Sequence, residues 1–318
     1  MNPIERWRKP RFSDEMSSIN ALLPLLRELN DLKRIRVAGR DGSLAQRLFF
    51  RAWARIIRGE SLEVVASTET ARAVVAARLA GVDAPVLKEA GLAEQEILAV
   101  FERAFDSVAK GLNPEFAAQL QSALDVRQNF EFDEEELPAF VRLLARQPRA
   151  GATRPGFARV VLEPAENHAE HCGVVAVNSF LTSSVYEAQP EQAFLTGLCH
   201  HSHNAFLPDA GDAGDHLLGE HLAPIMETFR ARALAGLPDW LHTEARQSLD
   251  AVYRCDTPES KAFQAGDSLD RVLEMEWHAR AGEFTLSVAL DQMDIIHPGP
   301  VQAFQLELMR ETGFKASP

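Results

Sequence analysis

The residues with the clearest chemical potential are histidines, and all ten of them follow residue 167. Histidine is the most frequent transition-metal ligand in proteins and a common proton carrier near neutral pH. A first group, AENHAEHCGVVAV, places His168 and His171 three residues apart, on one face of a helix if the helix has already begun. A capping or satisfied core histidine is the alternative for either residue alone.

A second group, LCHHSHNAFLPDAGDAGD, contains His200, His201 and His203, and Asp209 lies in the loop that follows. Adjacent residues on a helix point about 100° apart, so His200 and His201 can reach one ion only beside a helix end. The loop after them supplies such an end. The alternative is a solvated polar loop with incidental histidines.

A third segment, KAFQAGDSLDRVLEMEWHA, places Asp267 and Asp270 at the start of an apolar helical run. A carboxylate in a buried helix needs a partner, because burying a charge is costly unless the charge is paired or bound to a metal. Pairing with Arg271 or Arg280 competes with metal binding as the explanation.

The order of these three segments resembles the HD-domain superfamily of metal-dependent phosphohydrolases. That superfamily has a His on one helix, a His-Asp pair ending another, and a distant Asp on a later helix. AEHCGVVAV, LCHHSHNAFLPD and AGDSLDRVLE match this order over roughly residues 166–280, and the resemblance is closest to the branch with bacterial 5'-deoxynucleotidases. It implies a helical bundle with His171, His200 and Asp267 as metal ligands and Asp209 near the phosphate or sugar of a substrate.

The chain departs from the HD pattern at two positions. His201 stands where the superfamily has the Asp of the pair, and Asn204 where nucleotidases have a catalytic Glu. Imidazole can replace carboxylate at one divalent ion, but a neutral imidazole cannot bridge two metals. We therefore expect one of two outcomes: either His171, His200, His201 and Asp267 hold a single divalent ion in an altered site, with Mn, Co, Zn, Mg and Fe as the candidates, or the chemistry has drifted from that of the superfamily.

An ion held by three histidines and one aspartate is expected to activate water for attack on a small phosphate ester, with nucleotides among the candidate substrates. His203 or Asp209 would then carry the proton in place of the absent Glu. One rival is a di-iron oxygenase, as in HD-domain proteins with extra histidines between the pair and the last Asp. His221 and His242 are the candidates for its second metal, with a surface position as the alternative for His221. His168 and Asp270 are further candidates for metal ligands. A non-catalytic metal- or ligand-binding protein is a third interpretation.

The spacing of apolar residues predicts an all-α protein, with an HD-like bundle at 157–318 and a helical N-terminal region of unknown role at 1–150. Pro and Gly in the segment 147–156 predict a linker between them. Residues 61–66 could alternatively form a short strand. The expected helices are 19–32, 43–58, 68–79, 92–109, 114–124, 134–144, 170–187, 191–198, 216–234, 241–251, 258–281 and 300–312.

Charge and cysteine usage limit the partners and the compartment. The net charge of −13 disfavours nucleic-acid and membrane-surface binding, which need clustered Lys and Arg. Residues 1–60 nevertheless carry +6, either as a basic arm or because arginines of 46–58 coat the wet face of an amphipathic helix. Three irregularly spaced cysteines fit a reducing cytoplasm. A small-molecule substrate is expected, with homo-oligomerisation possible.

Overall fold

The computed structural model describes residues 12–124, 126, 130–157, 159–250, 252–281, 285–292, 295–296 and 298–314. Helices make up most of the described residues, and β-pairing in these ranges is confined to three isolated bridges. The prediction of an all-α protein is therefore confirmed. No helix in these ranges is long and apolar enough to span a membrane.

The N-terminal half contains seven described α-helices. The segment predicted as a possible strand is instead the first turn of α3, because the Ser61 hydroxyl caps the helix by accepting from the Val64 N–H. A similar cap at Ser43 begins α2. The bounds are α1 (Phe12–Asp31), α2 (Leu44–Ile57), α3 (Leu62–Leu79), α4 (Ala84–Glu89), α5 (Glu94–Val108), α6 (Pro114–Ser122) and α7 (Ala139–Leu144).

The C-terminal half contains eight more. The expected helix 216–234 is divided, because Gly219 has a φ of +53° and interrupts it between α10 and α11. The bounds are α8 (His168–Tyr186), α9 (Pro190–Cys199), α10 (Gly211–Leu218), α11 (Leu222–Leu234), α12 (Asp239–Asp250), α13 (Pro258–Ala281), α14 (Leu286–Gln292) and α15 (Gln302–Glu311).

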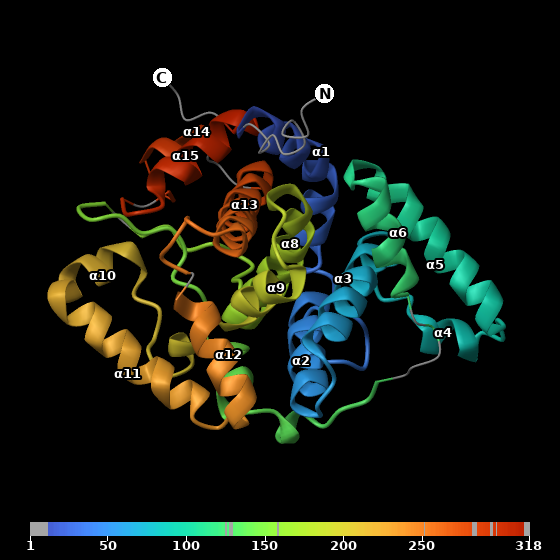
Figure 1. The fold of residues 1–318 in the computed structure, drawn as a ribbon. Helices are drawn as coiled ribbons and strands as arrows, with labels where there is room; N and C mark the ends of the chain where they lie inside the picture. The colour runs from blue at the N-terminus through green and yellow to red at the C-terminus, as the bar shows by residue number, and fades with distance from the viewer. Residues whose placement is uncertain are drawn as a thin grey trace, which may run out of the picture.

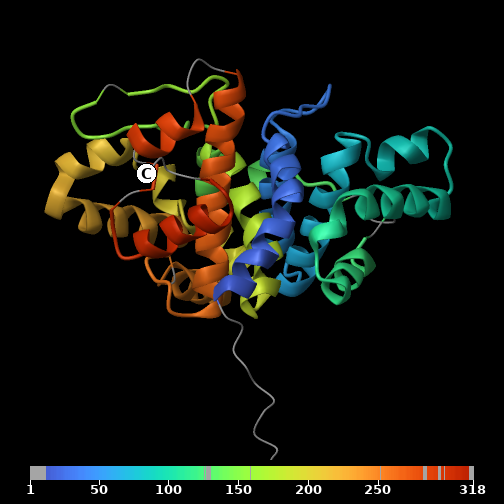
Figure 2. The ribbon, with the colours of Figure 1, turned by 90° about the horizontal axis from the view of Figure 1, so that it is seen from above.

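Helices α8, α9 and α13 form the centre of the molecule (Figure 1). Helices α1, α2 and α3 pack directly against them, while α4–α6 lie at one end and α10–α12 at the other, an arrangement visible in both views (Figures 1 and 2). Buried side chains of both halves belong to one continuous apolar core. The division predicted near residue 150 stays a prediction.

Two glycines allow α9 and α13 to approach α8 closely. A Cβ on Gly197 of α9 would lie 2.5 Å from the Cα of Ala176, and one on Gly266 of α13 would lie 2.7 Å from the backbone nitrogen of Ser179. Neither contact is compatible with a side chain at these backbone positions. Gly197 precedes His200 by one turn and Gly266 precedes Asp267, so the closest helix contacts occur beside the candidate metal ligands.

Candidate metal centre

Three potential ligand atoms converge where α8, the end of α9 and α13 meet. The Nε2 atoms of His171 and His200 are 3.1 Å apart. The Oδ1 atom of Asp267 lies 3.3 Å from His171 Nε2 and 3.9 Å from His200 Nε2. Both histidines are buried and the Asp267 side chain is 13% exposed. These separations suit neighbouring ligands around one ion with bonds of about 2.0–2.2 Å.

The other ring nitrogen of each histidine is held by a hydrogen bond. His200 Nδ1 donates to the carbonyl oxygen of Gly197 over 2.7 Å, one helical turn earlier. His171 Nδ1 faces Asp270 Oδ2 at 2.7 Å and donates to this carboxylate. Hydrogen bonds of this kind fix the tautomer and orientation of metal-binding histidines. They leave Nε2 of both rings as the atom available to an ion.

This geometry places electron-rich atoms against one another. Burial, and secondarily the nearby His171, lowers the pKa of His200 to about 3, so its Nε2 carries no proton at neutral pH. That lone pair faces His171 Nε2 and the carboxylate of Asp267. A positive charge between the three groups, supplied by a metal ion or a proton, satisfies all of them. The donor set of two imidazoles and a carboxylate fits a divalent transition metal.

The two carboxylate oxygens of Asp267 contact different partners. Oδ1 faces the histidines, and Oδ2 accepts from Arg271 over 2.8 Å, one turn along α13. Burial raises the pKa of Asp267, but Arg271 and the histidines outweigh this effect and hold the pKa well below its ordinary value. The pairing with Arg271 expected as a competing explanation is therefore present, and it leaves Oδ1 directed at the site.

His201 lies in the cluster but has both ring nitrogens engaged. Its ring centroid is 4.3 Å from that of His200, and His171, His200 and His201 form a group with the spacing of metal ligands. Its Nδ1 donates to Asn204 Oδ1 over 2.8 Å, and its Nε2 accepts from Arg149 Nη1 over 2.9 Å. As a ligand, His201 would have to exchange Arg149 for the ion, so its predicted role stays a prediction.

His168, His203 and Asp209 lie beside this cluster. His168 is fully buried, and neither ring nitrogen has a hydrogen-bond partner among the described residues. Its Nε2 is 3.6 Å from Asp209 Oδ2. His203 Nδ1 is also buried without a partner in the same ranges. Buried polar atoms are almost always satisfied by protein, water, ions or ligands, so these nitrogens are candidates for contacts with a bound group.

The carboxylate of Asp209 is held in a defined position. Its two oxygens accept from the backbone N–H groups of Ala150 and Gly211, each over 2.9 Å. Burial, followed by the charge of Arg230, lowers the pKa of His203 to about 4. His203 is therefore neutral at pH 7, and its imidazole is a weaker base than an exposed one. The structure brings both residues predicted to carry protons next to the histidine cluster.

Asp270 orients His171 and is bound on its other side by a buried lysine. Lys33 Nζ lies 2.8 Å from Asp270, 2.5 Å from Glu166 Oε1 and 3.4 Å from Glu274 Oε2. Burial lowers the pKa of Lys33, but these three carboxylates outweigh it and raise the pKa. The ammonium group thus neutralises two members of the group Glu166, His171 and Asp270, which is otherwise spaced like metal ligands.

The other two ligand candidates lie elsewhere. His221 is exposed at the start of α11, and His242 is partly exposed on α12. No hydrogen bond, ion pair or ring contact in the described ranges joins either residue to the cluster. The second metal site that an oxygenase would build from them therefore has no support from their positions.

Sequence reasoning missed two basic residues of the site, Lys33 and Arg149. The composition of the segment 147–156 predicts a linker, yet the side chain of Arg149 is 19% exposed and contacts both His201 and Glu166. Burial lowers the pKa of Arg149, and the carboxylates of Glu166 and Asp209 outweigh it and raise the pKa. Pro and Gly composition indicates a loop but cannot show that the loop folds back over a site.

Comparisons of the chain with protein-family models, curated proteins and solved structures found no match.

Proposed function

We propose that the chain is a metal-dependent phosphohydrolase with an HD-like helical bundle, acting on a small phosphate ester such as a nucleotide. The observation that carries the proposal is the convergence of His171 Nε2, His200 Nε2 and Asp267 Oδ1 within 3.1–3.9 Å. The hydrogen bonds to the opposite nitrogen of each imidazole support it. The order and helical placement of these residues agree with the HD pattern.

A divalent ion bound by these three residues would lower the pKa of a coordinated water towards about 7 and polarise a phosphoryl oxygen. Each of the three ligand side chains is held by a second residue. Asp270 bonds to His171, the carbonyl of Gly197 to His200, and Arg271 to Asp267. These contacts would keep the three ligand atoms in place to bind the divalent ion before a substrate enters the site.

Arg149 is the group suited to the charge of a phosphate. A guanidinium has five N–H donors, and Arg149 uses one on His201, while its Nε lies 3.5 Å from Glu166. The remaining donors can contact phosphate oxygens beside the candidate ligands. Preorganised donors of this kind stabilise negative charge in the transition state.

His203 is the proposed proton acceptor, because its Nδ1 is buried and has no hydrogen-bond partner among the described residues. Asp209 supports a charged imidazole nearby: it raises the pKa of His203 against the larger effect of burial. Its Oδ2 atom also lies 3.6 Å from His168. A proton removed from the attacking water would thus move towards His203, with Asp209 stabilising the resulting positive charge.

The test is a hydrolysis assay on purified protein supplied in turn with Mn, Co, Zn or Mg. The substrates are deoxynucleoside 5'-monophosphates and p-nitrophenyl phosphate, and phosphate release is measured. Wild-type protein and His242→Ala, a histidine variant outside the cluster, should show equal turnover, whereas His200→Ala should lose it. Absence of turnover with every metal, or equal turnover by His200→Ala, would overturn the proposal.

A further inference from the structure

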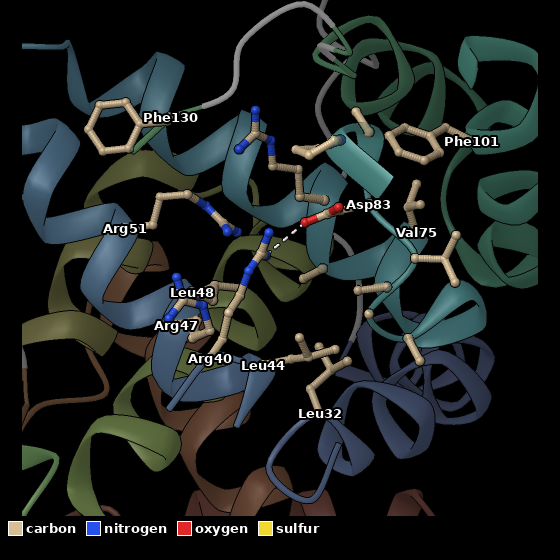
Figure 3. A pocket seen from close by; sticks show the side chains of 18 of the residues that line it. Leu32, Arg40, Leu44, Arg47, Leu48, Arg51, Val75, Asp83, Phe101 and Phe130 are labelled. Carbon is tan, nitrogen blue, oxygen red and sulfur yellow. Dashed lines mark hydrogen bonds and ion pairs between the residues drawn. The ribbon is translucent and has the colours of Figure 1, made fainter. Parts of the chain in front are cut away.

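A cavity of about 370 Å³ lies in the N-terminal half, between α2, α3 and the segments 80–85 and 130–132 (Figure 3). None of the histidine-cluster residues lines it. Helix α2 separates it from α8: Ala45 and Phe49 face Gly173 of α8, whereas Leu44, Arg47 and Arg51 line the cavity. The cavity is thus distinct from the candidate metal centre.

Four arginines line this cavity, Arg40, Arg47, Arg51 and Arg72, against two acidic residues, Asp83 and Glu131. The lining therefore has an excess of two positive charges. Figure 3 shows Arg40, Arg47 and Arg51 on one side, with Arg40 paired to Asp83 across the space. The interpretation of 46–58 as a wet amphipathic face is thus too simple, because some of its arginines surround a pocket.

Most of these arginines already have a partner. Arg40 Nη1 lies 2.8 Å from Asp83, and Arg51 Nε lies 2.7 Å from the buried Glu69. Burial raises the pKa of Glu69, but the charges of Arg51, Arg72 and Arg55 outweigh it and lower the pKa. The carboxylate of Glu69 is therefore ionised and interacts with several arginines. No hydrogen bond or ion pair among the described residues joins it to Arg47.

Arg47 is different, because no hydrogen bond or ion pair reaches its half-buried guanidinium from the described residues. Its guanidinium carbon lies 6.0 Å from the ring centroid of Phe132. Burial, followed by the charges of Arg40 and Arg51, lowers the pKa of Arg47; Glu134 and Asp83 oppose this from a distance. A partly desolvated cation beside other cations is costly unless an anion binds it.

The remainder of the cavity is apolar. Its lining includes Leu32, Leu48, Val75 and Phe101, all at most 7% exposed, together with the ring of Phe130. Binding sites for small molecules combine such an apolar lining with a few fixed polar groups, in volumes of about 300–1,000 Å³. The volume and lining here suit a small aromatic or aliphatic body with an anionic group at one end.

We propose that this cavity binds a small organic anion, whose apolar body packs on the leucine, valine and phenylalanine side chains and whose phosphate, sulfonate or carboxylate group binds Arg47. Arg40 and Arg51 add positive charge beside that group. The proposal is independent of the metal centre and of the reaction proposed for it.

The experiment is isothermal titration calorimetry of the full chain with naphthalene-1-sulfonate, which has an apolar body and a non-hydrolysable anionic group. Naphthalene-1-sulfonamide has the same body without the charge, and inorganic sulfate has the charge without the body. We expect the sulfonate to bind and both comparison compounds to bind at least ~10-fold more weakly. The sulfonamide lacks the charge-assisted hydrogen bond, which contributes about that factor or more, and sulfate lacks the apolar body that the cavity would bury.

Arg47→Met removes the proposed anion-binding charge and keeps the length of the side chain. It should weaken sulfonate binding ~10-fold or more and leave the thermal unfolding temperature of the free protein unchanged or raised. Arg78→Met, on the exposed part of α3 outside the cavity, is the matched control and should bind like the wild type. His200→Ala should also bind normally, which separates this site from the metal centre.

The proposal is overturned if the sulfonate does not bind at about 1 mM, a concentration that detects interactions near −4 kcal/mol. It is equally overturned if the sulfonamide binds as tightly as the sulfonate, or if Arg47→Met and Arg78→Met have the same affinity.

Discussion

Replacing Lys33 by Met tests whether the N-terminal half completes the candidate site. Lys33 is 3% exposed, and its ammonium group lies 2.5–2.8 Å from Glu166 and Asp270. At 2.8 Å each pair is attracted by roughly 6 kcal/mol at an effective dielectric constant of about 20. Desolvation of the charges offsets much of this attraction.

Removing the lysine leaves Asp270 and Glu166 without their strongest cation. Glu274 still has Arg34 at 2.5 Å and His278 at 3.0 Å after the substitution. The loss of the positive charge therefore affects mainly the carboxylates of Asp270 and Glu166. Truncating one partner of a buried ion pair costs about 3–5 kcal/mol because an uncompensated charge remains. We therefore expect Lys33→Met to lower the free energy of unfolding by about 3–5 kcal/mol.

The assay is equilibrium urea denaturation of the metal-free protein. Lys88→Met is the matched control, because the ion pair of Lys88 with Glu94 is exposed and should contribute at most about 1 kcal/mol. Adding Asp270→Asn to Lys33→Met should recover part of the loss, since it removes the uncompensated charge. A Lys33→Met cost no larger than that of Lys88→Met, or strictly additive effects of the two substitutions, would refute the reasoning.

Three further predictions concern packing, acid stability and catalysis. Gly197→Ala should lower the free energy of unfolding by about 1–3 kcal/mol and weaken metal binding, because the added Cβ would displace α9 from α8. Gly236→Ala should lower it far less in the same urea assay, since a Cβ at Gly236 would have no atom within 4 Å. Glu69 has a folded-state pKa below 4.5, so it contributes stability above that pH that is lost on acidification. Urea midpoints of the wild type should therefore fall more steeply below about pH 4.5 than those of Glu69→Gln, and parallel curves would contradict this. Arg149→Met should lower phosphate release ~100-fold with unchanged metal content, and undiminished turnover would exclude Arg149 from phosphate binding.

The helical architecture was predictable because apolar spacing reports directly on helices. Long periodic segments such as 258–281 were predicted with the bounds that α13 has. Short helices without a long apolar pattern, α4 and α14, were missed. The segment 134–144 was predicted as one helix, but Leu137 and Pro138 separate a 3-10 turn at Glu134–Glu136 from α7. Local turn chemistry decided each of these differences.

The candidate site was predictable only where residue type and order carry information. His171, His200 and Asp267 lie within reach of one another, as the sequence pattern indicated. Lys33 could not have been found, because it contacts Asp270 from 237 residues away and its neighbours carry no motif. The engagement of His201 by Arg149 was likewise hidden, since it depends on how the segment 147–167 returns to the histidines.

Metal content after equilibrium dialysis tests the central claim most directly. Protein stripped with a chelator is dialysed against Zn or Mn, and bound metal is counted per chain by elemental analysis. We predict one ion per wild-type chain, one per His242→Ala chain, and loss of the ion in His171→Ala and His200→Ala. No stoichiometric metal in the wild type, or equal metal content in all four proteins, would contradict the assignment of the site.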